Sequence, residues 1–280
     1  MAQNTELKVK FFASGYCEAN NCIVDKSWSI RKRKFYAVWA LFDFPGIGYV
    51  MFDTGYNELF QKATKQFPER FYRWFTPVGI NSKQTAKAIL AKRNIQVEDI
   101  KYIIISHFHA DHIAGLNDFP QAQFICSKTA FEQVEKISGI KAVSKGILHK
   151  LLPHDFEERL HFIEDFADKT IVNDCGMTEF KLFGNNCCSF ILLPGHASGM
   201  LGFIYKKETK LVIYATDASW NYATYSKSVL PLKIVKLFFD SWEDYIETQK
   251  KIKLFENKNE HAAILFTHCN NTLAYISNEI

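Results

Sequence analysis

His107-Phe108-His109-Ala110-Asp111-His112 places three imidazoles and one carboxylate within six residues. The stretch follows Tyr102–Ser106, an isoleucine-rich run bounded by polar residues that predicts a buried strand. Neutral nitrogen ligands and one hard oxygen at the end of a rigid strand suit a zinc-like ion, and Gly115 suits a tight turn into a helix. The alternative is a hydrogen-bonded polar loop. We disfavour it because three imidazoles buried so close together would be hard to satisfy without a metal.

The composition indicates a chain that can fill a sizeable core. Of its 280 residues, 48% are hydrophobic and 25 are phenylalanine, which suffices for one large domain or two modest ones. The net charge of +4 does not require a nucleic-acid partner. The one dense basic run, Arg31–Lys34, is interpreted as a solvated loop, with a patch for an anionic ligand as the alternative.

The cysteines predict reduced thiols rather than a disulfide framework. Their number is odd, their spacing is irregular, and no Cys-x-x-Cys pair occurs. The first ten residues lack an apolar signal core, and no run reaches the ~18 apolar residues that a membrane span needs. We therefore expect a cytoplasmic protein without a membrane segment. The seven cysteines are Cys17, Cys22, Cys126, Cys175, Cys187, Cys188 and Cys269.

Strand-like and helix-like segments are interspersed along the chain. Helices are expected in pieces over 57–80, from 81 to about 94, over 128–137 and from Ser241 onward. The mixed stretch 139–173 is interpreted as an insertion over or beside the site. This order predicts an α/β layered domain with helices on the outer faces. Strands are expected at 7–12, 34–44, 49–52, 102–105, 123–127, 179–183, 189–193, 201–205, 211–215 and 262–266.

Three further polar residues stand where an apolar run ends. His196 follows a Pro-Gly turn, Asp217 follows the run that begins at Leu211, and His268 follows the run that begins at Ile264. Because α/β folds bring strand ends to a common edge, we expect these residues to join the opening cluster. A single histidine after a strand is more often a satisfied structural residue. The whole set together favours a second group of metal ligands.

This ligand set resembles that of the metallo-β-lactamase superfamily, over nearly the whole chain. The resemblance implies an αββα sandwich, as one domain over 1–280 with insertions near 57–80 and 139–173. It also implies two divalent metal ions, expected to be Zn²⁺. The residues that carry it are His107-x-His109-x-Asp111-His112, His196, Asp217 and His268, with Asp53-Thr54-Gly55, which is similar to the loop that precedes the metal motif in this superfamily.

The resemblance further implies how the ligands are shared. His107, His109 and His196 would bind one metal. Asp111, His112 and His268 would bind the other, with Asp217 bridging both. A hydroxide shared by the two metals would attack an electrophilic carbonyl or phosphorus, and Asp111 would transfer a proton as the intermediate collapses. The remaining histidines match no motif position and are expected to be structural or exposed: His149, His154, His161 and His261.

Within the superfamily, the chain most resembles the N-acyl homoserine lactonase-like group, through Pro194–Met200 and Thr216–Ser219. This implies hydrolysis of a lactone or a related carboxylic ester that carries an apolar or acyl portion. Such lactonases usually carry a tyrosine three residues after the bridging aspartate, where this chain has Trp220. We expect Trp220 and Tyr222 to contact the substrate, with Tyr225 as a further candidate phenol.

Three other functions stay open. An acyl thioesterase of the hydroxyacylglutathione hydrolase type shares the ligands but carries a C-terminal helical region, and only twelve residues follow His268 (280 − 268 = 12). A phosphodiesterase is supported only by the basic run Arg31–Lys34, and nucleic acid is not an expected partner. A non-catalytic metal-bound sensor is disfavoured by the intact ligand set. The sequence leaves a homodimer open.

Overall fold

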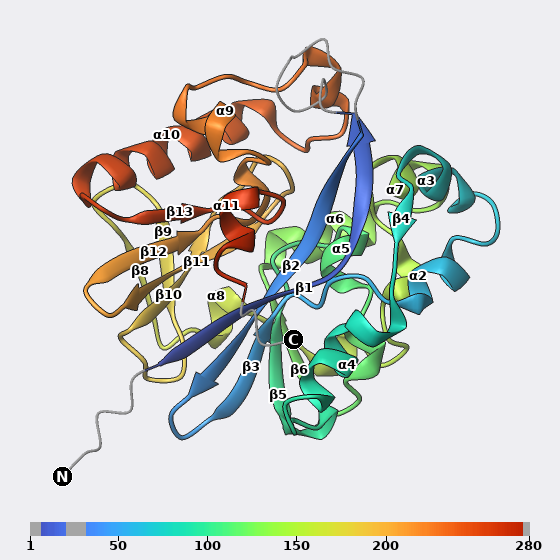
Figure 1. The fold of residues 1–280 in the computed structure, drawn as a ribbon, viewed down its shortest axis with the longest axis horizontal. Helices are drawn as coiled ribbons and strands as arrows, with labels where there is room; N and C mark the ends of the chain where they lie inside the picture. Colours follow the sequence, from blue (N-terminus) through green and yellow to red (C-terminus); the bar gives the residue numbers. More distant parts are fainter. Residues whose placement is uncertain (1–6, 21–31, 277–280) are drawn as a thin grey trace.

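The computed structural model describes residues 7–20 and 32–276, which form two β-sheets with helices around them (Figure 1). The first sheet has the order β4-β1-β2-β3-β5-β6-β7. Neighbouring strands from β4 to β3 are antiparallel, and those from β3 to β7 are parallel. Its strands are β1 (Lys8–Asn20), β2 (Lys32–Phe44), β3 (Gly48–Phe52), β4 (Val78–Gly79), β5 (Ile100–Ile104), β6 (Gln123–Cys126) and β7 (Leu160–Phe162).

The second sheet has the order β13-β12-β11-β10-β9-β8. Its neighbouring strands are antiparallel except for the parallel pair β12 and β13. Its strands are β8 (Lys169–Val172), β9 (Thr178–Lys181), β10 (Cys188–Leu192), β11 (Leu201–Lys207), β12 (Lys210–Tyr214) and β13 (Ala263–Leu265).

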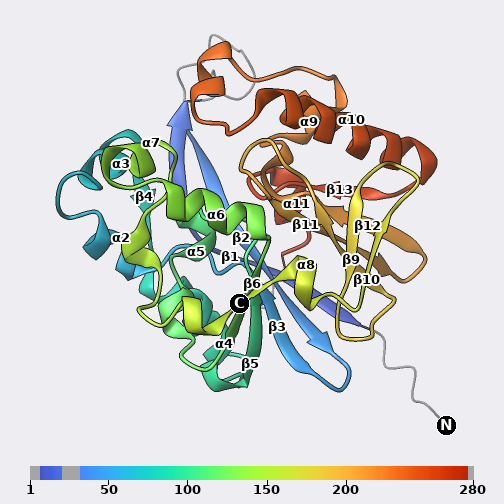
Figure 2. The same cartoon turned by 180° about the vertical axis from the view of Figure 1, so that it is seen from behind.

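Helices lie on both outer sides of the sheet pair. Helices α2, α3, α4 and α7 lie on one side, and α9 and α10 lie on the other (Figure 1); the view from behind shows the same division (Figure 2). The α-helices are α2 (Glu58–Ala63), α3 (Arg70–Phe75), α4 (Ala86–Ala91), α5 (Ala110–Ile113), α6 (Lys128–Lys136), α7 (Gly139–Ser144), α8 (Ile163–Phe166), α9 (Tyr222–Ser226), α10 (Trp242–Lys258) and α11 (Asn270–Leu273). Short 3₁₀ turns are η1 (Ser82–Gln84), η2 (Val97–Asp99), η3 (Leu116–Asp118), η4 (His149–Leu151), η5 (Glu157–Arg159), η6 (Thr216–Ala218) and η7 (Lys233–Leu237).

Aromatic rings fill the space between the sheets. Phe42 and Phe52 of the first sheet meet Phe203 of the second, with ring centroids 4.9 and 5.0 Å apart. These rings belong to one buried cluster that draws on both sheets. A second cluster joins the outer face of the first sheet to its helices, and a third joins the second sheet to α10. This arrangement confirms the predicted αββα sandwich and gives many of the phenylalanines a place in the core.

The second half of the stretch 139–173, which we expected to be an insertion, supplies two short edge strands. Residues Leu160–Phe162 pair in parallel with β6, and residues Lys169–Val172 pair with β9, so each completes an edge of a sheet. Edge strands of three or four residues are too short to show a clear alternation of polar and apolar residues. The remainder, 139–151, forms α7 and η4 beside the first sheet. The single-domain organisation stays a prediction.

The predictions for the cysteines and for membrane spans can be compared with the described residues. All six described cysteines carry free thiols. Cys22 lies outside the described residues, as does Arg31 of the basic run. Among the helices that the structure describes, none combines the length and the apolar character needed to cross a membrane.

The turn after β10 is fixed by helix α10. Ser241, the N-cap of α10, donates its amide hydrogen to the Gly195 carbonyl at 3.1 Å, and Thr248 donates its hydroxyl hydrogen to the Pro194 carbonyl at 2.7 Å. Gly195 has φ +133°, and a Cβ there would overlap the backbone of Tyr245. Glycine is therefore required at this point for both conformation and space.

We predict that Gly195→Ala lowers the free energy of unfolding by more than about 2 kcal/mol, because strain and overlap act together. Gly46→Ala is the matched control: Gly46 has φ +81° but open space around its Cα, so only the backbone strain of about 1 kcal/mol applies. Urea unfolding of both variants measures the difference. Equal decreases in the free energy of unfolding for the two variants would show that steric overlap with α10 does not restrict position 195.

Candidate metal centre

The seven predicted ligands lie at the ends of strands from both sheets. His107 follows β5, and the single turn of α5 then carries Asp111 and His112, with His109 at its N-cap. From the second sheet, His196 follows β10, Asp217 lies in η6 after β12, and His268 follows β13. Strand ends of two different sheets therefore supply one site.

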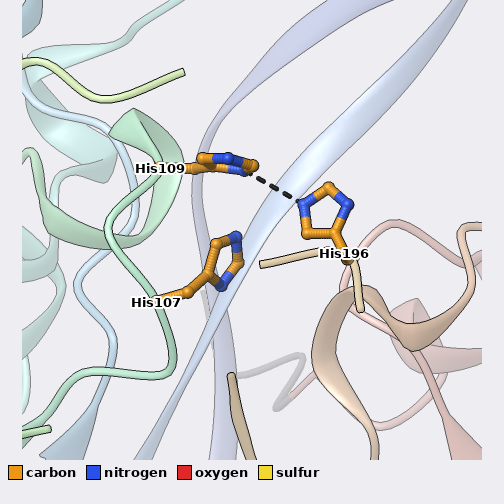
Figure 3. A group of neighbouring side chains, drawn as sticks. All are labelled: His107, His109 and His196. Carbon is orange, nitrogen blue, oxygen red and sulfur yellow. Dashed lines mark hydrogen bonds between the residues drawn. The ribbon is translucent and has the colours of Figure 1, made fainter. Parts of the chain in front are cut away.

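Three imidazoles form a first group (Figure 3). Ligand atoms of His107, His109 and His196 all lie within 4.8 Å of one another. His109 Nδ1 lies 3.0 Å from His196 Nε2. Ser106 Oγ lies 3.0 Å from Nδ1 of His107, so Nε2 is the nitrogen that His107 presents to its neighbours.

Two carboxylates and two imidazoles form a second group, again with ligand atoms within 4.8 Å of one another. Asp111 Oδ2 lies 3.4 Å from His112 Nε2 and 3.3 Å from His268 Nε2. Asp217 Oδ2 lies 3.3 Å from the same atom of His268. The residues of this group are all buried.

Asp217 connects the two groups. Its Oδ2 lies 3.4 Å from Nε2 of His196 in the first group, and its Oδ1 lies 3.8 Å from Nε2 of His112 in the second. A carboxylate that lies within 3.4 Å of an imidazole nitrogen from each group is placed between the two candidate cation positions. The division of ligands implied by the resemblance therefore has its counterpart in the geometry.

Residues behind the ligands fix their orientation. Asp53 Oδ2 lies 2.7 Å from His112 Nδ1, and Asp53 Oδ1 accepts the Ser106 amide hydrogen at 2.8 Å. The Tyr36 carbonyl lies 2.9 Å from His268 Nδ1. Such contacts orient a ligating imidazole and increase its basicity. The sequence analysis noted Asp53 only as part of a loop motif and missed its contact with His112.

Electrostatics divide the imidazoles into two kinds. Burial lowers the pKa of His107, His109 and His196, the last to about 3, so the first group is neutral at pH 7. Burial alone would also lower the pKa of His268, but the Asp217 and Asp111 carboxylates raise it to about 10. Asp111 and Asp53 likewise raise the pKa of His112.

The pKa values of the two carboxylates in the second group are lowered, in contrast to those of its imidazoles. Burial alone would raise their pKa, but His112 and His268 hold the pKa of both Asp111 and Asp217 well below the usual value. Both are therefore ionised at neutral pH.

The residues present fit two divalent cations. Four buried polar atoms of the centre have no hydrogen-bond partner among the described residues, although such atoms almost always have one. Imidazole nitrogens and carboxylate oxygens in this mixture are good ligands for divalent transition metals. A cation in each group would satisfy three of these atoms, Nε2 of His107, Nε2 of His112 and Oδ1 of Asp217; the fourth is Nδ1 of His196, whose ring presents Nε2 to the group.

Comparison with known families assigns the fold. The family model described as the metallo-beta-lactamase superfamily matches residues 38–258. The chain belongs to the metallo-β-lactamase superfamily. The matched range contains the whole ligand set except His268.

Relatives of this superfamily member include lactonases. It is 22% identical over 171 residues to the N-acyl homoserine lactonase AttM of Agrobacterium fabrum, a match that covers 59% of this chain and 57% of that protein. The matched part thus spans little more than half the length of this curated relative.

Among solved structures, an N-acyl homoserine lactone hydrolase with the product N-hexanoyl-L-homoserine at its catalytic metal centre superposes with a TM-score of 0.72 at 18% identity, over 98% of both chains. The dizinc quorum-quenching lactonase AidC superposes with a TM-score of 0.62 at 16% identity, over 95% of this chain and 88% of its own. At these identities the superpositions support the fold.

A pocket of about 160 Å³ opens onto the candidate metal ligands of this superfamily member. Strands β1 and β2 supply one part of its wall, and α3 and the segment before α9 supply others. Apart from the metal ligands, its lining consists of Cys17, Ala19, Phe35, Tyr56, Tyr72 and Trp220. Trp220 was predicted to contact the substrate, whereas Cys17, Ala19, Phe35 and Tyr56 were not, because these residues converge from segments distant in sequence.

The expected role of Tyr222 is corrected by its position. Tyr222 does not line the pocket, and its hydroxyl donates a hydrogen bond of 2.8 Å to Glu256 on α10. Tyr225 donates to the same carboxylate at 3.2 Å. Both phenols lie on α9, which turns them toward α10. Tyr56 and Tyr72 are the phenols that line the pocket.

Four histidines were expected to be structural or exposed, and none of them lies in the candidate metal centre. His149 Nε2 lies 3.0 Å from the Val134 carbonyl, and His161 Nε2 lies 3.1 Å from Gln123 Oε1. Neither these two nor His154 and His261 belong to a metal-ligand group among the described residues.

We predict that metal uptake by the metal-free protein releases about two protons per chain at pH 7, because ligating imidazoles must be neutral. The raised pKa of His112 and His268 means that both are protonated before metal binds. Apparent metal affinity therefore rises with pH toward about 10, the pKa of His268. Titration calorimetry with Zn²⁺ in buffers of different ionisation enthalpy counts the protons.

The His268→Asn variant should release about one proton fewer, since it lacks one of the protonated imidazoles. The His196→Asn variant is the matched control, because His196 is already neutral and its removal should leave the count unchanged. A release near zero from the unsubstituted protein would contradict the assignment of charges.

Proposed function

We propose that this chain is a binuclear zinc-dependent hydrolase that opens a lactone carrying an acyl chain. The observation that carries the proposal is the position of Asp217, within 3.4 Å of a histidine from each ligand group. The same carboxylate lines a pocket whose other walls are largely aromatic. AttM and AidC, to which the chain is similar, are both lactonases, and this similarity supports a lactone as the substrate class.

Zinc is proposed because imidazole nitrogens supply all ligands of the first group and half of those of the second. When bound, two such cations lower the pKa of a water molecule and polarise a substrate carbonyl. The protein's contribution is to hold seven ligand side chains in one buried cluster, with Asp53 and the Tyr36 carbonyl orienting two of them.

Asp111 is the proposed acid–base residue. It lines the pocket, and the imidazoles of His112 and His268 keep its pKa well below the usual value, so it is an ionised acceptor at neutral pH. It accepts the proton of the attacking water as the new carbon–oxygen bond forms. It returns that proton to the ring oxygen as the ester bond breaks, which leaves a hydroxyl and a carboxylic acid; the acid then releases its proton to solvent at neutral pH.

Tyr56 is the proposed hydrogen-bond donor to the substrate carbonyl. It would supply the phenol that lactonases usually carry at the position of Trp220. Tyr56 lines the pocket, and its buried hydroxyl lies beside the side chains of Tyr72 and Cys17, which line the pocket as well. Burial raises the pKa of Tyr56, so its hydroxyl keeps its proton. A protonated phenol in the pocket wall can donate a hydrogen bond to a ligand oxygen.

The apolar part of the pocket suits the acyl portion. Phe35 and Trp220 line it beside the metal ligands, and Tyr72 lines it from α3. Trp220 packs edge-on against His196, with ring centroids 5.8 Å apart. At about 160 Å³ the pocket is small, so we propose that it holds the lactone ring and the first part of the acyl chain.

The zinc-loaded protein should hydrolyse N-acyl homoserine lactones with kcat/KM on the order of 10⁴ M⁻¹ s⁻¹ or more. Acyl thioesters and bis(p-nitrophenyl) phosphate should be poorer substrates in the same assay.

Asp111→Asn should reduce lactone turnover about 10²-fold or more through loss of proton transfer. Turnover of the phosphodiester alone would overturn the proposal, and metal analysis of each variant excludes simple metal loss.

Tyr56→Phe should lower kcat for lactone opening about tenfold, because it removes one hydrogen bond to a charged intermediate. Tyr222→Phe is the matched control, since it removes a phenol that bonds Glu256 away from the pocket, and it should leave kcat unchanged. Steady-state kinetics on one lactone compare the two. If Tyr222→Phe alone reduced kcat, the assignment of the donor would be reversed.

A further inference from the structure

A second cavity lies beside the β1–β2 pair, and part of its wall comes from the face of these strands opposite to the metal pocket. Its volume is about 540 Å³. Tyr16 pairs with Tyr36 across the two strands, and both line this cavity; the next pair, Cys17 and Phe35, lines the metal pocket. Because successive side chains of a strand point to opposite faces, the two strands form a wall between two separate sites.

The cavity is strongly basic. Four cationic side chains line it and no carboxylate does, among the residues that the structure describes: Lys34, Lys83, Lys92 and Arg93. Lys83 and Lys92 are exposed and take part in no ion pair between described residues. The positive charge of these two is therefore not neutralised by any described part of the fold.

Aromatic and aliphatic side chains form the rest of the wall. The rings of Tyr16 and Tyr36 lie 5.7 Å apart, and Lys34 Nζ lies 4.2 Å from the centroid of Tyr16. Arg93 lies over Phe12 at 4.6 Å. A volume of about 540 Å³ lies within the range of sites for cofactor-sized molecules. The site thus joins ring faces to a cluster of ammonium groups.

We propose that this cavity binds a phosphorylated ligand with an aromatic ring, of the nucleotide class. Lysine ammonium groups pair well with phosphate oxygens, and several of them suit a ligand with more than one negative charge. Tyrosine rings offer faces on which a base can stack. A simple carboxylate or a bare phosphate would use the cations but leave the rings without a partner. Lys34 is the described member of the basic run 31–34 that contributes to this site.

Equilibrium dialysis of the metal-loaded protein with ADP, pyrophosphate and decanoate tests the proposal. ADP should bind, with pyrophosphate and decanoate at least tenfold weaker. The double substitution Lys83→Glu and Lys92→Glu should weaken ADP binding at least tenfold, and Tyr36→Leu should weaken ADP binding but not pyrophosphate binding. Lys169→Glu with Lys210→Glu, an equal charge change at exposed positions in the second sheet, should leave ADP binding intact.

The metal centre is the competing site for a phosphate, and Asp217→Asn separates the two. ADP binding that persists in metal-free Asp217→Asn supports the cavity. Binding that is lost there and unaffected by the double lysine substitution overturns it. Equal affinity for pyrophosphate and ADP, tighter binding of decanoate, or no ADP binding at all would overturn it as well. Lactone hydrolysis is measured separately, so failure of the proposed function stays distinguishable.

Discussion

The contact of Asp217 with histidines of both ligand groups is the constraint on which the site depends. Asp217 belongs to the second sheet, whereas His107, His109, Asp111 and His112 follow a strand of the first. The two sheets must therefore pack in one relative position for the carboxylate to lie between the imidazoles. The aromatic core supplies that position, since Phe203 of the second sheet contacts Phe42 and Phe52 of the first at about 5 Å between centroids. Close-packed interiors allow little sliding, so the core also aligns the centre.

Burying this many polar side chains demands partners for each of them. Three imidazoles have a partner for Nδ1, the nitrogen that points away from the ligand groups. Asp53 is the partner for His112, Ser106 for His107, and the Tyr36 carbonyl for His268. Among the atoms left over, Nε2 of His107, Nε2 of His112 and Oδ1 of Asp217 belong to the ligand atoms of the two groups. Without cations, the second group is held together by proton sharing between carboxylates and imidazoles, which is why the pKa of His268 is raised. The first group has no such compensation and contains only neutral imidazoles, so it depends most on a bound cation.

The sequence was sufficient for the sandwich and for the seven side chains that meet in the two candidate ligand groups, because each of these residues follows a strand with a recognisable apolar run. It was not sufficient for groups that act through distant contacts. Asp53 lies 59 positions from His112, yet bonds its ring. The Asp-Thr-Gly stretch directly after a predicted strand was the available signal for this role. Tyr222 was expected at the substrate because it is only five positions after Asp217 in the sequence. That distance along the chain does not reveal the direction of α9, which turns the Tyr222 hydroxyl toward Glu256. The edge strands β7 and β8 were missed because they are short.

The second half of strand β1 was hard to predict from the sequence, and its surroundings explain why. It runs to Asn20, well beyond the expected end at position 12, but residues 13–20 do not alternate between polar and apolar. A strand alternates clearly when one face meets the core and the other meets water. Here one face meets the metal pocket and the other meets the basic cavity, and a register shift between Ala13 and Tyr16 bends the strand at that point. Bulges of this kind commonly re-aim side chains beside functional sites. The missing alternation is therefore itself a consequence of two cavities sharing one wall.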